Sequence, residues 1–267
     1  MERNIEMKRV VVIGDMHCGH RVGLTPPAWQ LNPENENDAK WYKLHAAQWD
    51  WYVKTIGRLR PIHLLLVMGD CVEGQGKRAD GRDVMRHERG DQVEMARFAI
   101  AQAEARHIEM VYGSRYHVRD WEDDLCRLLG DKAKIGAHGW PKVHGVTFDI
   151  KHKVGGSSVP HGRLTAVARA KVWNELWAAR NRQPDADIIL RGHVHYWAYC
   201  GGMGAKREWM AMTCPALQDG GTEFGAEQCE GLIDFGLLYF DVHKDGSWER
   251  HAEIVVLDEQ RAAVSAY

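Results

Sequence analysis

The sequence predicts an α/β fold in a single domain that spans residues 1–267. Short apolar runs rich in β-branched residues alternate with longer segments of helical spacing in the early part of the chain, and the tail is rich in strands and turns. This order favours a mixed sheet, or two sheets, with helices packed against them. A chain of this length with 45% hydrophobic residues can bury roughly three-quarters of its unfolded surface in one core.

Five apolar segments are expected to form buried strands, because each carries β-branched or aliphatic residues and several end at a glycine. They are residues 8–14, 62–68, 107–113, 142–152 and 186–193. The fourth reads as a strand pair that turns near His144-Gly145. Beyond the fifth, the chain alternates and turns as β structure as far as Leu257, with one turn at Lys244-Asp245-Gly246.

Four segments have helical spacing and are expected to cover the strands. They are residues 37–60, 91–106, 119–129 and 163–180. Asn37 or Asp38 can cap the first of these helices, and Pro61 ends it. Residues 74–90 are too polar and rich in glycine for a core element. Their length favours a lid or a substrate-binding loop over a plain connection.

Composition excludes several classes of protein. The 35 basic and 37 acidic residues give a net charge of −2, which argues against a strongly basic binder of long nucleic acid. No apolar run approaches the roughly 20 residues of a membrane span, and the N-terminus is charged where a signal peptide would be apolar. The six cysteines form no CxxC pair and read as reduced thiols. These features predict a cytoplasmic protein with no membrane partner.

Residue types that bind metal ions follow each of the five expected strands. They lie in Asp15-Met16-His17, Gly69-Asp70-Cys71-Val72-Glu73, Gly113-Ser114-Arg115-Tyr116-His117, His152 and Gly192-His193-Val194-His195. Each segment alone is a common turn sequence. The loops beyond the carboxyl ends of strands gather in one crevice of an open α/β sheet, however, so these side chains are expected to meet. Carboxylates and imidazoles in this number suit two ions of Mn, Fe or Zn.

In their order, these segments resemble the signature of the calcineurin-like metallophosphoesterase superfamily, which is DxH, GDxx(D/E), GNH(D/E), a lone His and GHxH. The resemblance covers about residues 10–240. The third block departs from it, since Ser114 stands where the family has Asn and His117 arrives two residues late. The loop GHRVGLTPP and the GSxxH form look like variants that phages and prophages encode. The resemblance implies an αββα sandwich of two mixed β-sheets flanked by helices.

The resemblance also implies a ligand set for two divalent metal ions. Asp15, His17 and His195 would hold the first ion, His152 and His193 would hold the second, and Asp70 would bridge them. Mn²⁺ is the expected metal, with Fe, Zn, Ni or Mg as alternatives. Two such cations bind phosphoryl oxygens and activate a bridging water or hydroxide as the nucleophile. Asp70 and His117 would be catalytic, with His117 donating a proton or hydrogen bond beside the scissile phosphate.

The predicted function is therefore the hydrolysis of phosphate esters at a dinuclear metal centre. Phosphodiesters, as in a nucleotide or nucleic acid, are favoured by the resemblance and by basic loops that include Arg89 and Arg191. Candidate substrate contacts are Ser114, Arg115, Lys77 and Arg78. A phosphomonoesterase or protein phosphatase is one alternative. A non-catalytic binding module with a degenerate site is another, because the third block is altered. The sequence does not indicate an oligomeric state.

Overall fold

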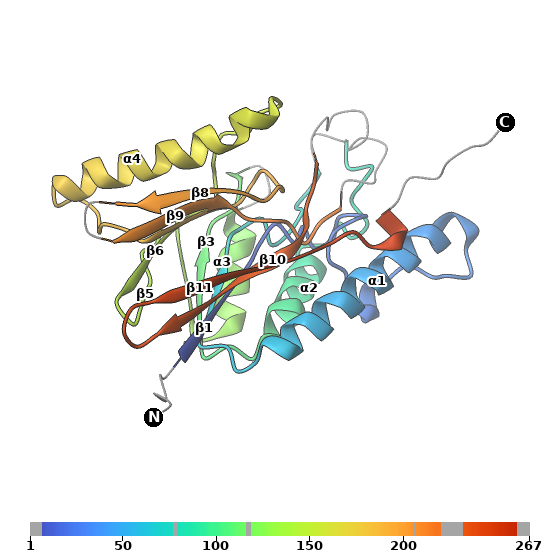
Figure 1. Cartoon of the computed structure of the whole chain (residues 1–267). Helices are drawn as coiled ribbons and strands as arrows, with labels where there is room; N and C mark the ends of the chain where they lie inside the picture. The colour runs from blue at the N-terminus through green and yellow to red at the C-terminus, as the bar shows by residue number, and fades with distance from the viewer. Residues whose placement is uncertain (1–6, 77–79, 116–118, 205–206, 220–231, 261–267) are drawn as a thin grey trace.

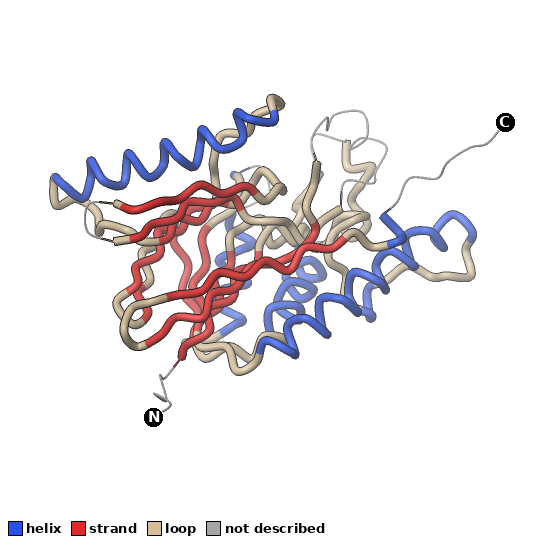
Figure 2. Tube along the Cα trace, in the orientation of Figure 1, coloured by secondary structure: helices blue, strands red, loops and turns tan. Residues whose placement is uncertain are grey.

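The structure of the protein is a computed structural model that describes residues 7–76, 80–115, 119–204, 207–219 and 232–260 (Figure 1). Two mixed β-sheets face one another, and helices lie on their outer sides (Figures 1 and 2). The predicted fold class is confirmed. No helix among these residues is both long and apolar enough to span a membrane. The five cysteines within them form no disulfide.

The first sheet has six strands in the order β11-β10-β1-β2-β3-β4. Their bounds are β1 (Met7–Ile13), β2 (Leu64–Val67), β3 (His107–Val111), β4 (Ala133–Gly136), β10 (Phe235–His243) and β11 (Trp248–Val255). Strands β1 to β4 run parallel, while β10 is antiparallel to both β1 and β11. The parallel strands place their carboxyl ends along one edge of the sheet.

The second sheet has five strands in the order β5-β6-β7-β9-β8. Their bounds are β5 (Lys142–Val143), β6 (Val146–Lys151), β7 (Ile188–Arg191), β8 (Ala198–Met203) and β9 (Glu208–Thr213). β6, β7 and β9 are parallel to one another, and the edge strands β5 and β8 are antiparallel to their neighbours. The sheet is therefore mixed, like the first.

Helices α1 (Glu36–Leu59), α2 (Arg89–Ala101) and α3 (Arg119–Leu129) lie outside the first sheet, and α4 (Thr165–Ala179) lies outside the second. Short 3₁₀ turns occur at η1 (Pro27–Trp29), η4 (Pro160–Leu164) and η5 (Asp258–Gln260). Val11 and Ile13 of β1 pack toward the helices, whereas Val10 and Val12 pack toward the second sheet. Because side chains alternate along a strand, a strand buried on both faces needs a continuous apolar run.

Most expected elements form within a few residues of their predicted bounds. The strand pair turns at His144-Gly145, and β10 and β11 are joined across Lys244-Asp245-Gly246. The sequence did not predict β4, which has only four residues and no fully buried side chain. Pairing with β3 makes this segment a strand, and such pairing leaves no local signature in the sequence.

Candidate metal centre

The six proposed metal ligands all follow the carboxyl ends of parallel strands. Asp15 and His17 come after β1, and Asp70 comes after β2 in the same sheet. His152 follows β6, and the His193-Val194-His195 segment follows β7 of the second sheet. The described side chains form two compact groups, Asp15 with His17 and His195, and Asp70 with His152 and His193. The division of the ligands matches the one that the family resemblance implies, with Asp70 standing in the second group. The bridging role of Asp70 stays a prediction.

Five of these six residues adopt a left-handed backbone conformation. Their φ angles are 47° for Asp15, 44° for His17, 47° for Asp70, 77° for His193 and 57° for His195. Non-glycine residues seldom adopt this region, and each costs about 1–3 kcal/mol unless its surroundings impose it. Backbone hydrogen bonds between neighbouring loops hold two of these residues in place, from Asp15 N to Gly69 O at 2.9 Å and from His17 N to Asp70 O at 3.0 Å. Such strain is concentrated at functional sites.

The first group presents three donor atoms from buried or half-buried side chains. His195 Nε2 lies 3.2 Å from Asp15 Oδ1 and 3.3 Å from His17 Nε2. Bonds of about 2.0–2.1 Å to one cation place tetrahedral ligand atoms about 3.3–3.4 Å apart, so these spacings fit a shared ion. Glu73 Oε2 lies 2.8 Å from His17 Nδ1. This contact orients the ring and leaves Nε2 toward the group.

The second group has the same construction, with Ser114 inserted among its donor atoms. His152 Nε2 lies 3.1 Å from Asp70 Oδ2, and His152 Nδ1 donates to Met68 O at 2.6 Å. Ser114 Oγ lies 3.1 Å from Asp70 Oδ2, 3.3 Å from His152 Nε2 and 3.2 Å from His193 Nδ1. The serine hydroxyl is therefore a fourth polar atom within contact distance of the three donor atoms of the group. The two groups are joined where His193 N donates to Asp15 Oδ1 at 3.1 Å.

The clustered charges shift the pKa values of the group members. Burial alone would lower the pKa of His152, but its hydrogen bond to Asp70 and the charges of Asp15 and Asp70 outweigh burial and raise it to about 9. Burial would raise the pKa of Asp15, yet His195 and His152 hold it below its ordinary value. The pKa of His193 is lowered by burial and by the neighbouring His152. An imidazolium at His152 cannot bind a metal, so a cation must displace its proton.

We therefore expect Mn²⁺ binding to release protons in neutral buffer. The pKa of His152 is raised to about 9, so the ring is increasingly protonated as the pH falls below that value. The apparent affinity of the second group should drop about tenfold for each pH unit below it. Calorimetric titration in buffers of different ionisation enthalpy measures this release directly. An affinity that does not change between about pH 6 and pH 8 would contradict the expectation.

Close backbone approach explains two glycines of the site loops. A Cβ on Gly113 would lie 2.1 Å from Asp70 Oδ1, far inside contact distance. Gly69 has φ +87°, and a Cβ there would lie 2.7 Å from the Gly113 backbone. Gly69 needs glycine for both its conformation and its contact, and Gly113 needs glycine for its contact. The two glycines therefore bring the loop after β2 against the loop after β3.

Sequence reasoning missed a carboxylate that links these two loops. Glu122 of α3 is 1% exposed and accepts hydrogen bonds from Cys71 N at 3.1 Å and from Gly113 N at 2.7 Å. Burial and the charge of Asp70 raise the pKa of Glu122 to about 7, although the two N–H groups oppose the shift. In the sequence, Glu122 is one of several acids in the same helix, and no local signal separates it from Asp123 or Asp124.

Of the predicted substrate contacts, the structure describes Ser114 and Arg115. Ser114 lies inside the second group, and Arg115 is exposed beside it. Lys77, Arg78 and His117 lie outside the described residues.

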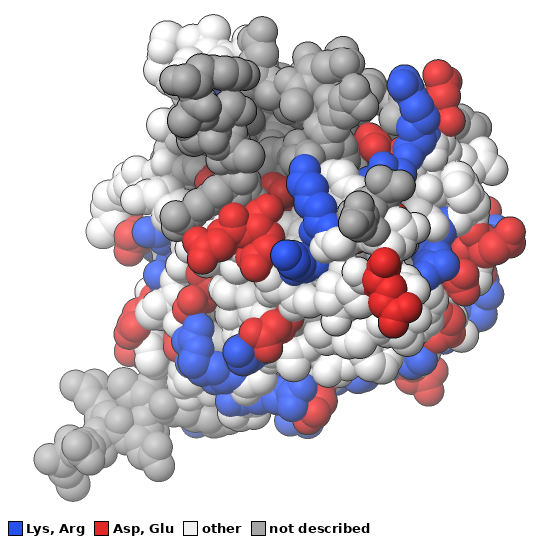
Figure 3. Space-filling view, turned by 90° about the vertical axis from the view of Figure 1, so that its right-hand side faces the viewer, with Lys and Arg blue, Asp and Glu red and all other residues white. Residues whose placement is uncertain are grey.

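Two of the basic residues in the loops are engaged by carboxylates. Arg89 Nε donates to Asp124 at 2.7 Å, and Arg191 is buried within 2.7 Å of Asp149. Both guanidinium groups therefore have carboxylate partners, and a part for them in attracting an anionic substrate stays a prediction. Figure 3 shows one face of the molecule, on which Lys and Arg alternate with Asp and Glu.

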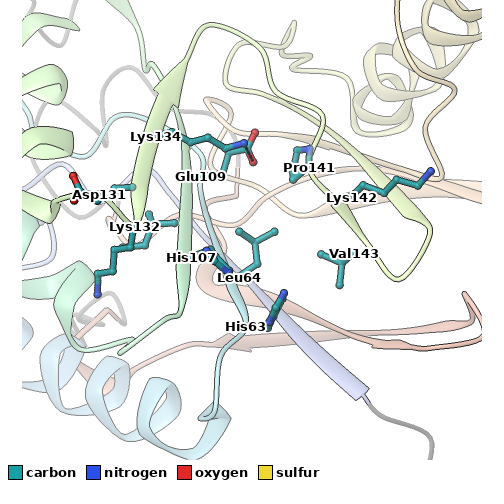
Figure 4. Close-up of a pocket in the computed structure, with 12 residues that line it drawn as sticks. His63, Leu64, His107, Glu109, Asp131, Lys132, Lys134, Pro141, Lys142 and Val143 are labelled. Atoms are coloured by element: carbon teal, nitrogen blue, oxygen red, sulfur yellow. Dashed lines mark ion pairs between the residues drawn. The ribbon is translucent and has the colours of Figure 1, made fainter.

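A surface groove of about 400 Å³ lies at the opposite ends of the strands (Figure 4). His63 stands just before β2, and His107 is the first residue of β3. Lys132, Lys134 and Lys142 also line the groove, and Lys134 pairs with Glu109 at 3.0 Å. None of the six proposed metal ligands lines it. It is therefore separate from the two Asp/His groups.

No protein-family model matches the sequence, and no curated protein matches it. Among solved structures, the chain is similar to an archaeal phosphodiesterase at 8% identity, with a TM-score of 0.46, over 92% of this chain and 99% of that one. It is also similar to the NAD nucleotidase of Haemophilus influenzae at 10% identity, with a TM-score of 0.41, over 98% of this chain and 54% of that one. A Thermotoga maritima protein is 13% identical, with a TM-score of 0.42, over 93% of this chain and 99% of that one. Function is therefore inferred from the side chains of this chain.

Proposed function

We propose that this protein is a dinuclear metal-dependent phosphoesterase that hydrolyses phosphodiesters. The observation that carries the proposal is the pair of adjoining groups, each with one carboxylate and two imidazoles, at the carboxyl ends of parallel strands. Donor atoms in these groups lie 3.1–3.3 Å apart, from His152 to Asp70 in one group and from His195 to Asp15 and His17 in the other. These distances fit ligand bonds of about 2.0–2.1 Å. Mixed N and O donors of this kind suit Mn, Fe or Zn.

Asp15, His17 and His195 would hold one divalent cation, and Asp70, His152 and His193 would hold the other. Asp70 would also be shared between the two cations, as the family resemblance implies. Bound there, two such cations would supply Lewis-acid stabilisation of the phosphoryl charge and lower the pKa of a water. The protein's part is to fix the imidazoles. Glu73 holds the His17 ring, and the Met68 carbonyl holds the His152 ring, so that each ring keeps its Nε2 toward its group.

The proposed preference for diesters rests on the sequence resemblance and on exposed basic residues beside the site. Arg115 follows Ser114, and Lys151 and Lys153 flank His152; all three are exposed. These cations suit the phosphate of a diester such as a nucleotide or nucleic acid. Arg89 and Arg191, by contrast, are tied to carboxylates. His117 is proposed as the proton donor to the leaving group.

The proposal is tested by hydrolysis of an aryl phosphodiester and the matching monoester after loading with Mn²⁺ or Zn²⁺. We expect chelator-sensitive turnover with a higher kcat/KM for the diester. Replacement of His195 by Asn should remove the cation of the first group and abolish the activity. Replacement of the exposed His107, at the far end of the sheet, by Asn is the matched control and should change neither. Turnover that is unaffected by chelator, with no transition metal bound after loading, would overturn the proposal.

We expect the two cations to load in sequence, with the second group the weaker one. A neutral serine hydroxyl is a poorer ligand than the amide oxygen expected from the family, although Ser114 Oγ lies within 3.3 Å of all three donors of that group. Calorimetric titration of metal-free protein with Mn²⁺ should show one tight binding event and one weaker binding event. Replacing Ser114 with Ala should weaken only the second event. Two equal, tight events would contradict the expectation.

A further inference from the structure

The part of the chain that surrounds and follows His152 is basic and contains no acidic residue. Residues 150–174 carry no Asp or Glu, although 37 of the 267 residues are acidic, which is about one in seven. Lys171 is buried, and its Nζ lies 3.2 Å from Asp185. The other Lys and Arg side chains of this stretch are exposed or half-buried, and they are Lys151, Lys153, Arg163 and Arg169. These four define a basic segment, residues 151–169.

The positive charge of the basic segment is not neutralised by neighbouring carboxylates. Within the part of the chain that the structure describes, no Asp or Glu pairs with any of its four cations. Arg89 and Arg191, elsewhere in the site loops, are both held by carboxylates. An unpaired guanidinium or ammonium group can bind an anion without first breaking an ion pair. The basic segment is therefore a ready binding surface for negative charge.

The basic segment lies against the loop that follows β7. A Cβ on Gly156 would lie 3.6 Å from the side chain of Val194. Arg163 Cζ lies 4.6 Å from the centre of the Tyr196 ring, and Tyr196 directly follows the proposed ligand His195. The segment therefore starts at a proposed ligand of the second group and ends against a neighbour of the first group. Its cations lie beside the candidate metal centre.

The two arginines are positioned by contacts that leave their charge available. Tyr196 is 5% exposed, so its ring is a fixed support for the Arg163 guanidinium. Stacking uses the flat face of a guanidinium and leaves the N–H groups along its edge to bind a phosphate. Arg169 belongs to α4, yet a Cβ on Gly155 would lie 3.9 Å from its Nη2. Gly155 is two residues from Lys153, so cations from η4 and α4 lie along the same segment.

We propose that the substrate is a polynucleotide, and that the basic segment binds backbone phosphates next to the scissile one. The inference rests on the proposed phosphodiesterase function. A small diester has one phosphate, which the two metal cations would contact, so it leaves a row of further cations without a partner. A polynucleotide carries a negative charge at every nucleotide, and proteins bind it largely by neutralising successive phosphates with Lys and Arg.

Fluorescence anisotropy of a labelled oligothymidylate of about 20 nucleotides tests the inference over about 50–200 mM KCl. The full-length chain is kept free of metal with a chelator, so that the strand stays intact. We expect Arg163→Gln combined with Arg169→Gln to weaken binding about tenfold or more at about 100 mM KCl. The slope of log affinity against log salt should become shallower by about 1.4, because each lost contact with a single-strand phosphate removes about 0.7.

Lys132→Gln combined with Lys142→Gln is the matched control. It removes the same charge from two exposed lysines that line the groove at the opposite ends of the strands. This control should keep the wild-type affinity and salt dependence. A thymidine dinucleotide should bind at least about tenfold more weakly than the longer strand, because it lacks the neighbouring phosphates. Unchanged circular dichroism will show that both double variants fold.

Hydrolysis by the Mn²⁺-loaded protein separates this inference from the proposed function. The double arginine variant should raise KM for the oligothymidylate about tenfold or more, and kcat/KM for the aryl diester should fall much less. A wild type that hydrolyses neither ester would contradict the proposed function, and the anisotropy comparison would still test the basic segment. Equal binding of the long strand by the wild type and the arginine variant would overturn the inference. So would an equal loss in the lysine control, or a dinucleotide that binds as tightly as the longer strand.

Discussion

Replacing Asp70 with Asn is expected to reduce turnover of an aryl phosphodiester by about 10³-fold or more, since several kcal/mol of charge stabilisation depend on the ions it would share. Ser114 N donates to Asp70 Oδ1 at 2.6 Å, which forces an Asn amide to keep its oxygen there. The amide nitrogen would then replace Oδ2, which lies 3.1 Å from both Ser114 Oγ and His152 Nε2. An amide NH₂ does not bind a cation, and the negative charge is also lost.

Metal content and steady-state kinetics measured on the same preparation test this expectation. Asp50→Asn is the matched control, because Asp50 is an exposed carboxylate on α1 that pairs with Lys54 at the surface. The control should keep both metal and activity. An Asp70→Asn variant that retained two ions and more than about a tenth of the wild-type turnover would show that Asp70 has no central role, because the loss would then be below about 1.4 kcal/mol.

Replacing Glu122 with Ala is expected to lower the free energy of unfolding by about 2 kcal/mol or more, because two buried N–H donors lose their acceptors. These donors, Cys71 N and Gly113 N, belong to residues adjacent to Asp70 and Ser114. The second group should therefore lose metal affinity, while the first group, which Glu122 does not contact, should keep it. Glu122→Gln retains one acceptor oxygen, so its effect should be smaller.

Chemical denaturation and calorimetric metal titration at low temperature separate the two effects. Glu94→Ala on α2 is the control, because Glu94 is partly exposed and pairs with Arg97 one turn away. We expect a change in stability within about 0.5 kcal/mol for this control. If Glu122→Ala unfolded at the same denaturant concentration as the wild type and bound two ions normally, the assigned link between the loops would be wrong.

The positions of the metal-binding residue types could be predicted because the signals for them are local. A continuous apolar run specifies a strand buried on both faces, as in β1 and β2, and a polar residue directly after the run falls at its carboxyl end. Parallel pairing then brings Asp15 and Asp70 to one edge, which is a consequence of α/β topology. The family resemblance implied how the ligands divide into two groups. Their binding of cations stays a prediction.

By itself, the sequence determined the fold class, the order of the main helices and strands, and the strand ends at which Asp15, Asp70, His152 and His193 lie. Only the tertiary structure decided that Glu122 joins two loops, that Arg89 and Arg191 are neutralised, and that α4 turns its tryptophans outward. Secondary structure can be predicted from the sequence because backbone preference and hydrophobic periodicity involve residues only a few positions apart. The partners of Glu122 and Arg191 lie far from them in the sequence; Cys71, for example, is 51 residues from Glu122. Only tertiary packing brings such residues into contact.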